Sequence, residues 1–263
     1  QKAANESISK YHDSLMANKN AWCVSAVPTL AWAKKLFPDL SEETAVTALW
    51  DHILKSSRIN QNPIESWKDH IKNLGKSIKF LNDYRFKALK FKSKSGTNLY
   101  VKLPDNHVWL GGTEMTPEGV EFAANIPTEE VFTVPHKTGV DGVVYGSKPF
   151  TFHGKLIADF SLTFKHGKII DFSASAGYDT QKEIIETDEG SKYIGEIALV
   201  PYDSPISKSN TLFYNTLYDE NAACHFAIGR GYPSCIKGGE YMTKDVLEQH
   251  GVNRSLIHVD MMF

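Results

Sequence analysis

Residues 86–103 read FKALKFKSKSGTNLYVKL, and the class of the fold turns on this stretch. Apolar and polar residues alternate over residues 86–92 and again over 98–103, as in strands that bury one face. The SKSG at residues 93–96 supplies turn residues, so the stretch predicts a β-hairpin. Upstream of it, apolar residues recur at helical spacing. Downstream, the period of two continues, and the sequence therefore predicts an α+β protein that changes from helix to sheet near residue 86.

The N-terminal segment, residues 1–85, has the start signals of successive helices. Pro28 can open one helix, Ser41 is a preferred N-cap, and Pro63 can open another. Apolar residues three and four apart follow each of these positions. We expect a helical layer over residues 1–85 that packs on a mostly antiparallel β domain over residues 86–263, with the two parts forming one continuous domain.

Further elements are predicted downstream of the first hairpin. Residues 160–164 and 170–172 alternate around a KHGK turn and predict a second hairpin. Helical spacing predicts a helix over residues 220–228, ended by a glycine, and another over residues 243–249.

Composition excludes several classes of protein. The chain has 263 residues with 41% apolar and 23% charged residues and a net charge of −2, which is ordinary for a globular protein with a sizeable core. No basic block accompanies a recognition module, so no nucleic-acid partner is expected. No apolar run reaches about 18 residues, and no signal peptide is seen, so no membrane association is expected.

The cysteines and the chain ends add two expectations. The three cysteines are odd in number and lack CxxC spacing, which favours a reducing compartment, and we expect a cytoplasmic protein. The chain opens at Gln1 and stops at the apolar residues 261–263. We therefore expect it to be a piece of a longer chain.

Carboxylates and histidines in the last third have spacings that suit a metal centre. His258 and Asp260 are two residues apart, so in a strand both would point to one face while Ile257 and Val259 face the core. Glu196 lies in the apolar run IGEIALV, where an unpaired carboxylate is costly to bury. A metal would offset that cost. The alternatives are a salt bridge or a position on an exposed strand face.

Five further residues are ambiguous from the sequence alone. Glu220 and His225 are five apart, about 140° around a helix, so one metal takes both only if Glu220 lies at the frayed helix start. Two adjacent metals could instead take one residue each. Without a metal, Glu220 is a first-turn acid and His225 a core histidine. In a strand, one of Glu129 and Glu130 would face inward and the other outward, and alternation does not decide which. Tyr232 could supply a phenol to the site or only pack.

Four motifs, in order, resemble the M29 family of metallo-aminopeptidases, the aminopeptidase T, AmpS and PepS group. They are NIPTEEVFT at residues 125–133, YIGEIALVP at 193–201, FYNTLYDENAACHFAIG at 213–229 and HVD at 258–260. The resemblance covers nearly the whole chain. It implies two divalent ions (zinc, cobalt, manganese or magnesium), with Glu196 bridging them. The ligands that match the family are Glu130, Glu196, Glu220, His225, His258 and Asp260.

The resemblance also implies an activity, the removal of the N-terminal residue from a peptide with a free N-terminus. One metal would bind the α-amine and polarise the scissile carbonyl, and a bridging water or hydroxide would attack it. Tyr232 would stabilise the oxyanion, and Glu129 is the candidate general base unless the bridging hydroxide serves. A homodimer is implied, and we expect the family's N-terminal α/β domain to lie outside these residues. Two alternatives stay open: another metal-dependent amidase or hydrolase, or an inactive metal-binding dimerisation fragment.

Overall fold

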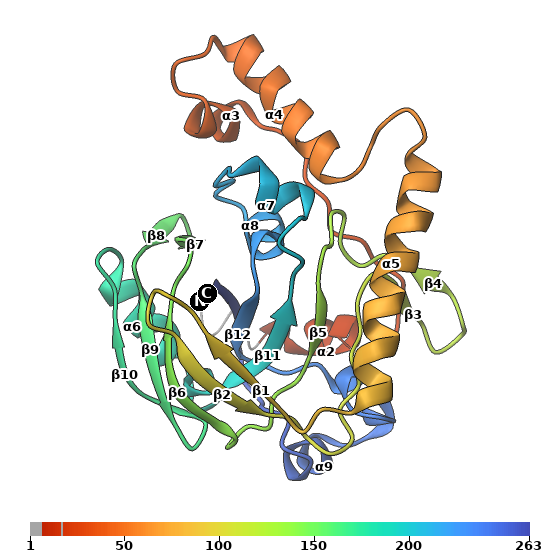
Figure 1. The fold of residues 1–263 in the computed structure, drawn as a ribbon, viewed down its shortest axis with the longest axis vertical. Helices are drawn as coiled ribbons and strands as arrows, with labels where there is room; N and C mark the ends of the chain where they lie inside the picture. The colour runs from red at the N-terminus through yellow and green to blue at the C-terminus, as the bar shows by residue number, and fades with distance from the viewer. Residues whose placement is uncertain (1–6, 17) are drawn as a thin grey trace.

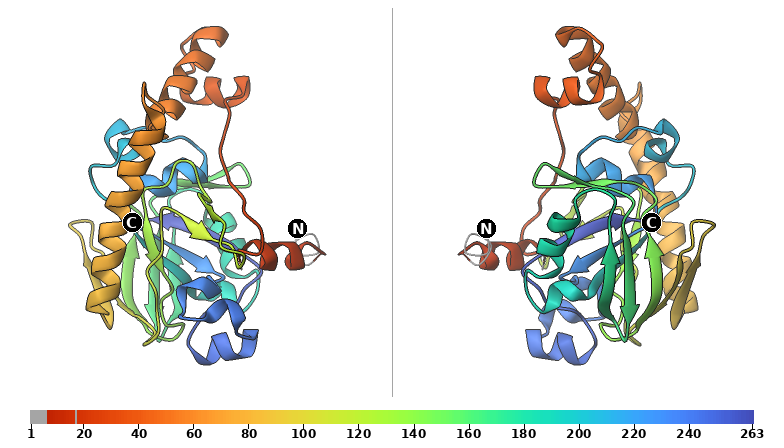
Figure 2. Two further views of the ribbon diagram at one scale, coloured as in Figure 1. Left: turned by 90° about the vertical axis from the view of Figure 1, so that its right-hand side faces the viewer. Right: turned by 90° about the vertical axis from the view of Figure 1, so that its left-hand side faces the viewer.

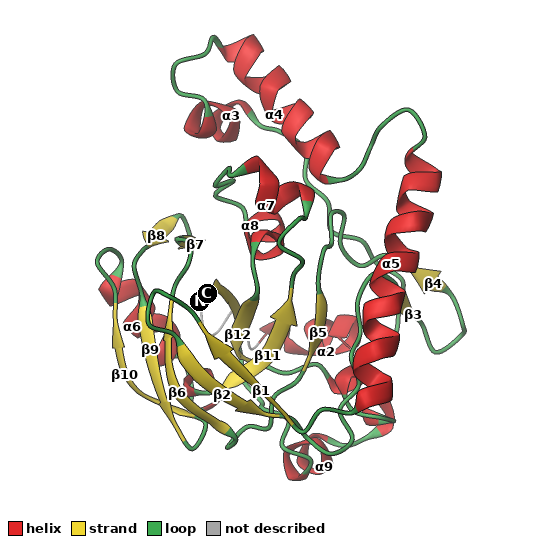
Figure 3. Ribbon diagram, viewed as in Figure 1, coloured by secondary structure: helices red, strands yellow, loops and turns green. Residues whose placement is uncertain are grey.

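Two antiparallel sheets make up the centre of the protein in the computed structural model, which describes residues 7–16 and 18–263 (Figures 1 and 3). The larger sheet has the order β1-β2-β6-β9-β10. Its strands are β1 (Ala88–Lys92), β2 (Asn98–Lys102), β6 (Val140–Tyr145), β9 (Ser161–Lys165) and β10 (Lys168–Ser173). The second sheet has the order β13-β12-β11-β5. Its strands are β5 (Val131–Thr133), β11 (Ile194–Leu199), β12 (His225–Gly229) and β13 (His258–Met262).

Two small hairpins lie outside these sheets. One pairs β3 (Glu114–Met115) with β4 (Glu121–Phe122), and the other pairs β7 (Phe150–Phe152) with β8 (Lys155–Ile157). The prediction of an α+β fold with mostly antiparallel sheets is confirmed.

Both predicted hairpins are confirmed. Phe91 pairs with Leu99 across β1 and β2, and Leu99 is fully buried whereas the next residue, Tyr100, is 46% exposed. This is the alternation that the sequence shows over residues 98–103. In the second hairpin, Ile169 of β10 pairs with Phe164 of β9.

The two sheets bury their facing sides in one shared core. Phe164 of β9 and Phe226 of β12 meet edge to face across the two sheets, with ring centroids 6.2 Å apart. Phe263, which follows β13, also contacts the ring of Phe226. Aromatic side chains contribute much of the buried apolar area of a core. The Phe226 ring therefore holds the second sheet against the first.

Replacing Phe226 by alanine is expected to lower the free energy of unfolding by about 3–5 kcal/mol, because a fully buried ring is lost and a cavity remains between the sheets. Urea unfolding followed by tryptophan fluorescence measures the loss. Tyr100→Ala, on the exposed face of β2, is the matched control and should cost much less. Similar losses in the two variants would contradict the shared core.

The N-terminal helices begin largely where the sequence predicts. α4 (Glu42–Ser56) is capped by Ser41, whose hydroxyl accepts the Thr44 N–H, and α5 (Pro63–Tyr84) starts at its proline. α2 (Ser9–Met16) precedes them. α3 (Leu30–Leu36) starts after Thr29, which caps it, and not at Pro28.

The prediction that all of residues 1–85 are helical is wrong for residues 18–29. After a turn at residues 18–20 this segment has no helix, and Val24 forms a parallel bridge with Asn125. Residues 1–6 and 17 lie outside the described part of the chain.

The helices divide between two places on the β core. α5 runs beside β5 and sends Leu74 and Leu81 into the shared core (Figure 1). α3 and α4 extend away from the sheets (Figure 2). They pack on α7 (Pro205–Ser209) and α8 (Thr216–Asp219), where Leu49, Phe213 and Tyr218 are buried together. The division into residues 1–85 and 86–263 stays a prediction.

The expected helix over residues 220–228 is wrong. α8 ends at Asp219, a 3₁₀ turn covers Glu220–Ala222, and residues 225–229 form β12. β12 pairs with β11 on one side and with β13 on the other. A central strand buried on both faces reads as a continuous apolar run, which helical spacing also fits.

The remaining helices are α6 (Tyr178–Ile185) and α9 (Lys244–Gln249). α9 confirms the helix expected over residues 243–249. Within the described residues, no helix is both long enough and apolar enough to cross a membrane.

Candidate metal centre

The second sheet has two unlike faces. Ile197, Phe226 and Val259 point into the core shared with the larger sheet. Because side chains alternate along a strand, their sequence neighbours point to the opposite face. That opposite face carries Glu196 of β11, His225 of β12, and His258 and Asp260 of β13. The strands therefore bring together side chains that are far apart in the sequence.

One small residue separates two of these carboxylates. Ala227 on the central strand pairs with Glu196 on one side and with Asp260 on the other. All three lie on the same face, and the methyl group of Ala227 is the smallest side chain that the row could carry apart from glycine. The space above Ala227 is therefore bordered by two carboxylates.

A β-bulge aims Glu196 at this space. The pairing of β11 with β12 shifts register between Ile194 and Glu196. Bulges redirect the side chain that follows and are frequent next to active sites. Gly195 sits within the bulge, where a Cβ atom would collide with the carbonyl oxygen of Arg230. The glycine therefore permits the close backbone approach that the bulge needs.

Glu130 and Glu220 reach the site from loops. Glu130 immediately precedes β5, and Gly111 crosses directly over its carbonyl with φ +151°, so that a Cβ there would collide with the Glu130 oxygen. Glycine is the residue that tolerates both demands. Glu220 lies in the 3₁₀ turn after α8, which packs against β13.

The distances define two groups of side chains that are able to ligate a metal. Nε2 of His225 lies 2.8 Å from Oε2 of Glu130 and 3.7 Å from Oε1 of Glu196. Nε2 of His258 lies 3.4 Å from Oδ1 of Asp260 and 3.8 Å from Oε2 of Glu196. Within each group the ligand atoms lie within 4.8 Å of one another, and Glu196 belongs to both. Its two oxygens thus face different histidines.

Glu220 lies outside both groups but contacts the second of them. Its carboxyl donates a hydrogen bond to Asp260. Burial, and then the charge of Asp260, raises the pKa of Glu220 well above its usual range, so that this carboxyl holds its proton. All six predicted ligands therefore come together, five of them in the two groups and Glu220 beside them.

Burial and mutual charge shift the other pKa values strongly. Burial, followed by the charge of Glu130, raises the pKa of Glu196 to about 8. Burial lowers the pKa of His258, but the charges of Asp260 and Glu196 outweigh it and raise that pKa to about 9. Burial also lowers the pKa of His225, but the contact with Glu130 and the charge of Glu130 outweigh burial and raise that pKa well above its usual range. Asp260 shifts the other way: burial raises its pKa, but the charge of His258 outweighs burial and lowers it.

Two features of the cluster suit divalent cations. One is the chemistry of its ligand atoms, and the other is a buried oxygen that lacks a hydrogen bond. Oε2 of Glu130 is buried and makes no hydrogen bond of acceptable angle, although His225 is 2.8 Å away. A buried carboxylate oxygen without a donor is costly. Carboxylate oxygen and imidazole nitrogen are common ligands of zinc and related divalent ions. An ion at this position would satisfy the unpaired oxygen.

Metal binding is expected to release protons, because bound histidine is neutral and bound carboxylate is ionised. With pKa values of about 8 for Glu196 and about 9 for His258, both groups are protonated at neutral pH. We expect more than one proton per chain to be released at about pH 7, and affinity to rise from about pH 6 to about pH 9. Calorimetric titration of Zn²⁺ in buffers of different ionisation enthalpy counts the protons. Affinity that is flat with pH would contradict these shifts.

The two predicted catalytic residues lie in different surroundings. The ring of Tyr232 meets that of His258 edge to face, with centroids 5.2 Å apart. Burial, and then the charge of Glu196, raises the pKa of Tyr232, so its phenol stays protonated. Glu129 points away from the ligand groups and forms a two-point ion pair with Arg58, one contact being 2.8 Å from Nη2 to Oε2.

The expectation that one of Glu129 and Glu130 would face outward is wrong. Glu129 is 2% exposed and Glu130 is 7% exposed. The two carboxylates do point to different sides, but Arg58 covers the side to which Glu129 points. The covering residue follows α4, about 70 positions earlier in the sequence, so local alternation carries no signal of it.

The structure adds one acidic residue that the sequence did not single out. Glu114 of β3 accepts a hydrogen bond from the Asn18 side chain. Burial raises its pKa, and the charge of Glu130 adds to the effect. Glu114 lies in a two-residue strand without periodicity, and nothing in its local sequence distinguishes it.

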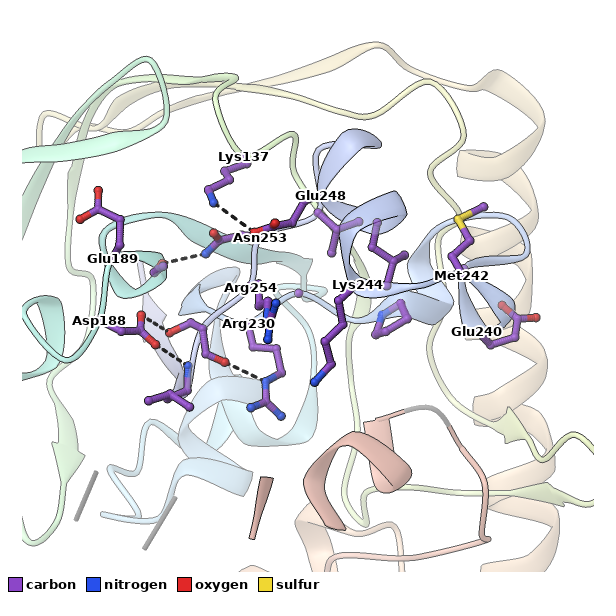
Figure 4. A pocket seen from close by; sticks show the side chains of 18 of the residues that line it. Lys137, Asp188, Glu189, Arg230, Glu240, Met242, Lys244, Glu248, Asn253 and Arg254 are labelled. Atoms are coloured by element: carbon purple, nitrogen blue, oxygen red, sulfur yellow. Dashed lines mark hydrogen bonds and ion pairs between the residues drawn. The ribbon is translucent and has the colours of Figure 1, made fainter. Parts of the chain in front are cut away.

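A separate cavity of about 690 Å³ has a lining that is distinct from this centre (Figure 4). Its lining comes from α9, the turn before it, and residues 252–256, and includes Arg230 and Gly231 just before Tyr232. Lys137 and Glu248, both in its lining, form an ion pair with Nζ and Oε1 3.7 Å apart. None of the eight candidate site residues lines this cavity, so its size does not bear on the metal cluster.

The fold and the site together define a metalloprotein with a carboxylate-rich centre, the kind of centre that metal-dependent hydrolases use. The chain belongs to the thermophilic metalloprotease family M29, whose family model matches residues 1–263.

Three relatives illustrate the membership. Aminopeptidase AmpS of Bacillus subtilis is 48% identical over 263 residues, which cover 100% of this chain and 64% of that protein. Aminopeptidase 2 of Geobacillus stearothermophilus is 47% identical over 262 residues, covering 99% and 63%. The solved structure of wild-type AmpT from Thermus thermophilus superposes with a TM-score of 0.88 at 37% identity, covering 97% of this chain and 61% of that one. The chain thus spans less than two thirds of the length of these relatives.

Proposed function

We propose that this chain carries the catalytic centre of an aminopeptidase that uses two divalent ions of the zinc, cobalt, manganese or magnesium group. The observation that carries the proposal is the sharing of Glu196 by two ligand groups, in a chain that belongs to the M29 family. Charge balance supports it. The carboxylates Glu130, Glu196, Glu220 and Asp260 carry −4 when ionised, and two divalent ions carry +4.

Each ligand has a proposed place. Glu130 and His225 would hold one ion, His258 and Asp260 would hold the other, Glu196 would be shared by both, and Glu220 would complete the set beside Asp260. When bound, the ions lower the pKa of water and polarise a carbonyl group. The sheet fixes the spacing of the ligands, because four of the six come from its three adjacent strands β11, β12 and β13.

Tyr232 is proposed to donate a hydrogen bond to the oxyanion of the tetrahedral intermediate. Its raised pKa supports this role, because a phenol that stays protonated remains a donor at neutral and alkaline pH. Glu129 stays the candidate general base. Since Arg58 engages both of its carboxylate oxygens, that role requires the ion pair to open.

The substrate is proposed to be a peptide with a free N-terminus, as the names of the relatives suggest. We also propose a homodimer in the cytoplasm. Apolar side chains exposed on the N-terminal segment support an interface, among them Val27, Trp50 and Ile64. The free, exposed thiol of Cys23 suits a reducing compartment. Light scattering coupled to size exclusion measures the mass in solution.

The test of the function is the release of p-nitroaniline from leucine-p-nitroanilide with Co²⁺ or Zn²⁺ added. N-acetyl-leucine-p-nitroanilide is the matched substrate that lacks a free amine. Turnover of the free amine alone, abolished by EDTA and restored by metal, is the expected result. Equal turnover of both substrates would point to a metal-dependent amidase. Two bound ions without turnover of either would point to an inactive metal-binding fragment.

A further inference from the structure

The loop that carries Glu130 is fixed by side chains from outside the sheet. His70 of α5 bonds through Nε2 to the Thr128 carbonyl at 2.7 Å. Arg58, in the turn after α4, holds the Glu129 carboxylate by two contacts. Both anchors therefore come from the N-terminal helices and act on the two residues that precede Glu130.

Asn221 extends this network to a second candidate ligand. Its Oδ1 accepts the Glu129 N–H at 2.6 Å, and its Nδ2 donates to the Leu217 carbonyl at 3.0 Å and to Oε1 of Glu220 at 3.5 Å. Asn221 is fully buried. Glu129 thus lies between Arg58 on one side and the Glu220 turn on the other, with Glu130 next to it in the chain.

Arg58 occupies a backbone conformation that a side-chain-bearing residue rarely takes. Its φ is +55°, in the left-handed region. Glycine adopts this region freely, whereas other residues keep it only where surrounding contacts hold them. A glycine at position 58 would suit the backbone and would lose the ion pair. The backbone conformation alone favours glycine, so the ion pair with Glu129 is the reason for an arginine side chain at this position.

We propose that Arg58 is a positioning residue for the metal centre. Its ion pair with Glu129 fixes Glu130 and, through Asn221, the turn of Glu220, so that metal affinity depends on the N-terminal helices. The proposal rests on the proposed metal site. Two-point arginine–carboxylate pairs give directional as well as electrostatic restraint, which a lysine at the same place would not reproduce.

The experiment is a calorimetric titration of Zn²⁺ into metal-stripped wild type, R58G, R58K, E129Q and R58G/E129Q. Removing the supporting partner of a ligand typically weakens metal affinity about 10- to 100-fold. We expect R58G and E129Q each to raise the dissociation constant about 10-fold or more, while two ions still bind at saturation. R58K should recover only part of the affinity. The double variant should be no weaker than the worse single variant, because both remove the same ion pair.

Two controls separate positioning from stability. R58G relieves the left-handed strain but leaves the buried carboxylate of Glu129 without a partner, so the melting temperature of R58G/E129Q without metal should not fall below that of R58G. K79A removes an ordinary ion pair, Lys79 with Asp83 on the exposed face of α5, and should leave the dissociation constant unchanged.

Three results would overturn the proposal. Wild-type dissociation constants in R58G and E129Q would do so and leave the proposed function standing. The second result is a rise in the dissociation constant that follows the fall in melting temperature in every variant, K79A included. That would show a general loss of stability instead of a loss of positioning. Failure of wild type to bind two ions would overturn the proposed function, and this proposal with it.

Discussion

Glu196→Gln is expected to reduce the metal content from two ions per chain to one or none and to lower kcat/KM at least about 1,000-fold. The change keeps the size of the side chain but removes the charge that both ligand groups share. Metal ions supply several kcal/mol of charge stabilisation in the transition state, and each 1.4 kcal/mol corresponds to about a tenfold change in rate. Elemental analysis after dialysis against Zn²⁺, together with the leucine-p-nitroanilide assay, measures both effects.

Glu121→Gln is the control for this result, since Glu121 is an exposed carboxylate on β4. It should retain two ions and full activity. Retention of two tightly bound ions by Glu196→Gln would show that another group bridges them. The role of Glu196 would then have to pass to a different carboxylate of the cluster.

Tyr232→Phe is expected to lower kcat about 100- to 1,000-fold while KM and metal content stay near their wild-type values. That is the loss measured when a single oxyanion donor is removed. Phenylalanine keeps the ring contacts with Phe132 and His258, so the packing around the ligand is preserved. Steady-state kinetics with elemental analysis of the same sample separates the two effects.

The matched control is Tyr202→Phe, because Tyr202 is 93% exposed. It should behave as wild type. If Tyr232→Phe lost metal as well as activity, the hydroxyl would be acting through the ligands. If it lost neither, the phenol would only be packing, which is the alternative that the sequence leaves open.

The elements with a regular period could be predicted from the sequence, because the period reports burial directly. The hairpin of β1 and β2 alternates along residues 98–103, and Ser41 and Pro63 mark helix starts through purely local chemistry. His258 and Asp260 belong to the same category. Their spacing of two in a strand placed both on one face, with Val259 in the core, as the structure shows.

β12 could not be predicted in the same way. Residues 225–229 are all buried and, after His225, carry no polar side chain, so their sequence fits a buried helix as well as a buried strand. Only the partners β11 and β13, one earlier and one later in the chain, decide for a strand. Glu220 and His225 therefore do not share a helix, and the angle of about 140° expected between them does not apply, since Glu220 lies in a 3₁₀ turn and His225 in β12.

The support around the ligands was also beyond sequence reasoning. The pairing of Arg58 with Glu129 spans 71 positions, and no local pattern connects them. The motif around residues 125–133 pointed to Glu130 as the matching acid, which the structure brings into the first ligand group. The motif itself does not show what holds Glu130 in place, because the supporting contacts depend on how the N-terminal helices pack on the sheets.

The position of β13 has a consequence for how fast the protein exchanges its metal. In the described part of the chain, β13 is an edge strand whose neighbour in the sheet is β12, yet it carries both His258 and Asp260. Edge strands open more readily than central ones, and local opening of this strand would separate two proposed ligands at once from Glu196. Bound ions would link β13 to Glu196 of β11 and so hold the edge strand in the sheet. Metal release would then follow the fraying of one strand, and amide hydrogens at Val259 and Met261 would exchange faster once a chelator has removed the ions.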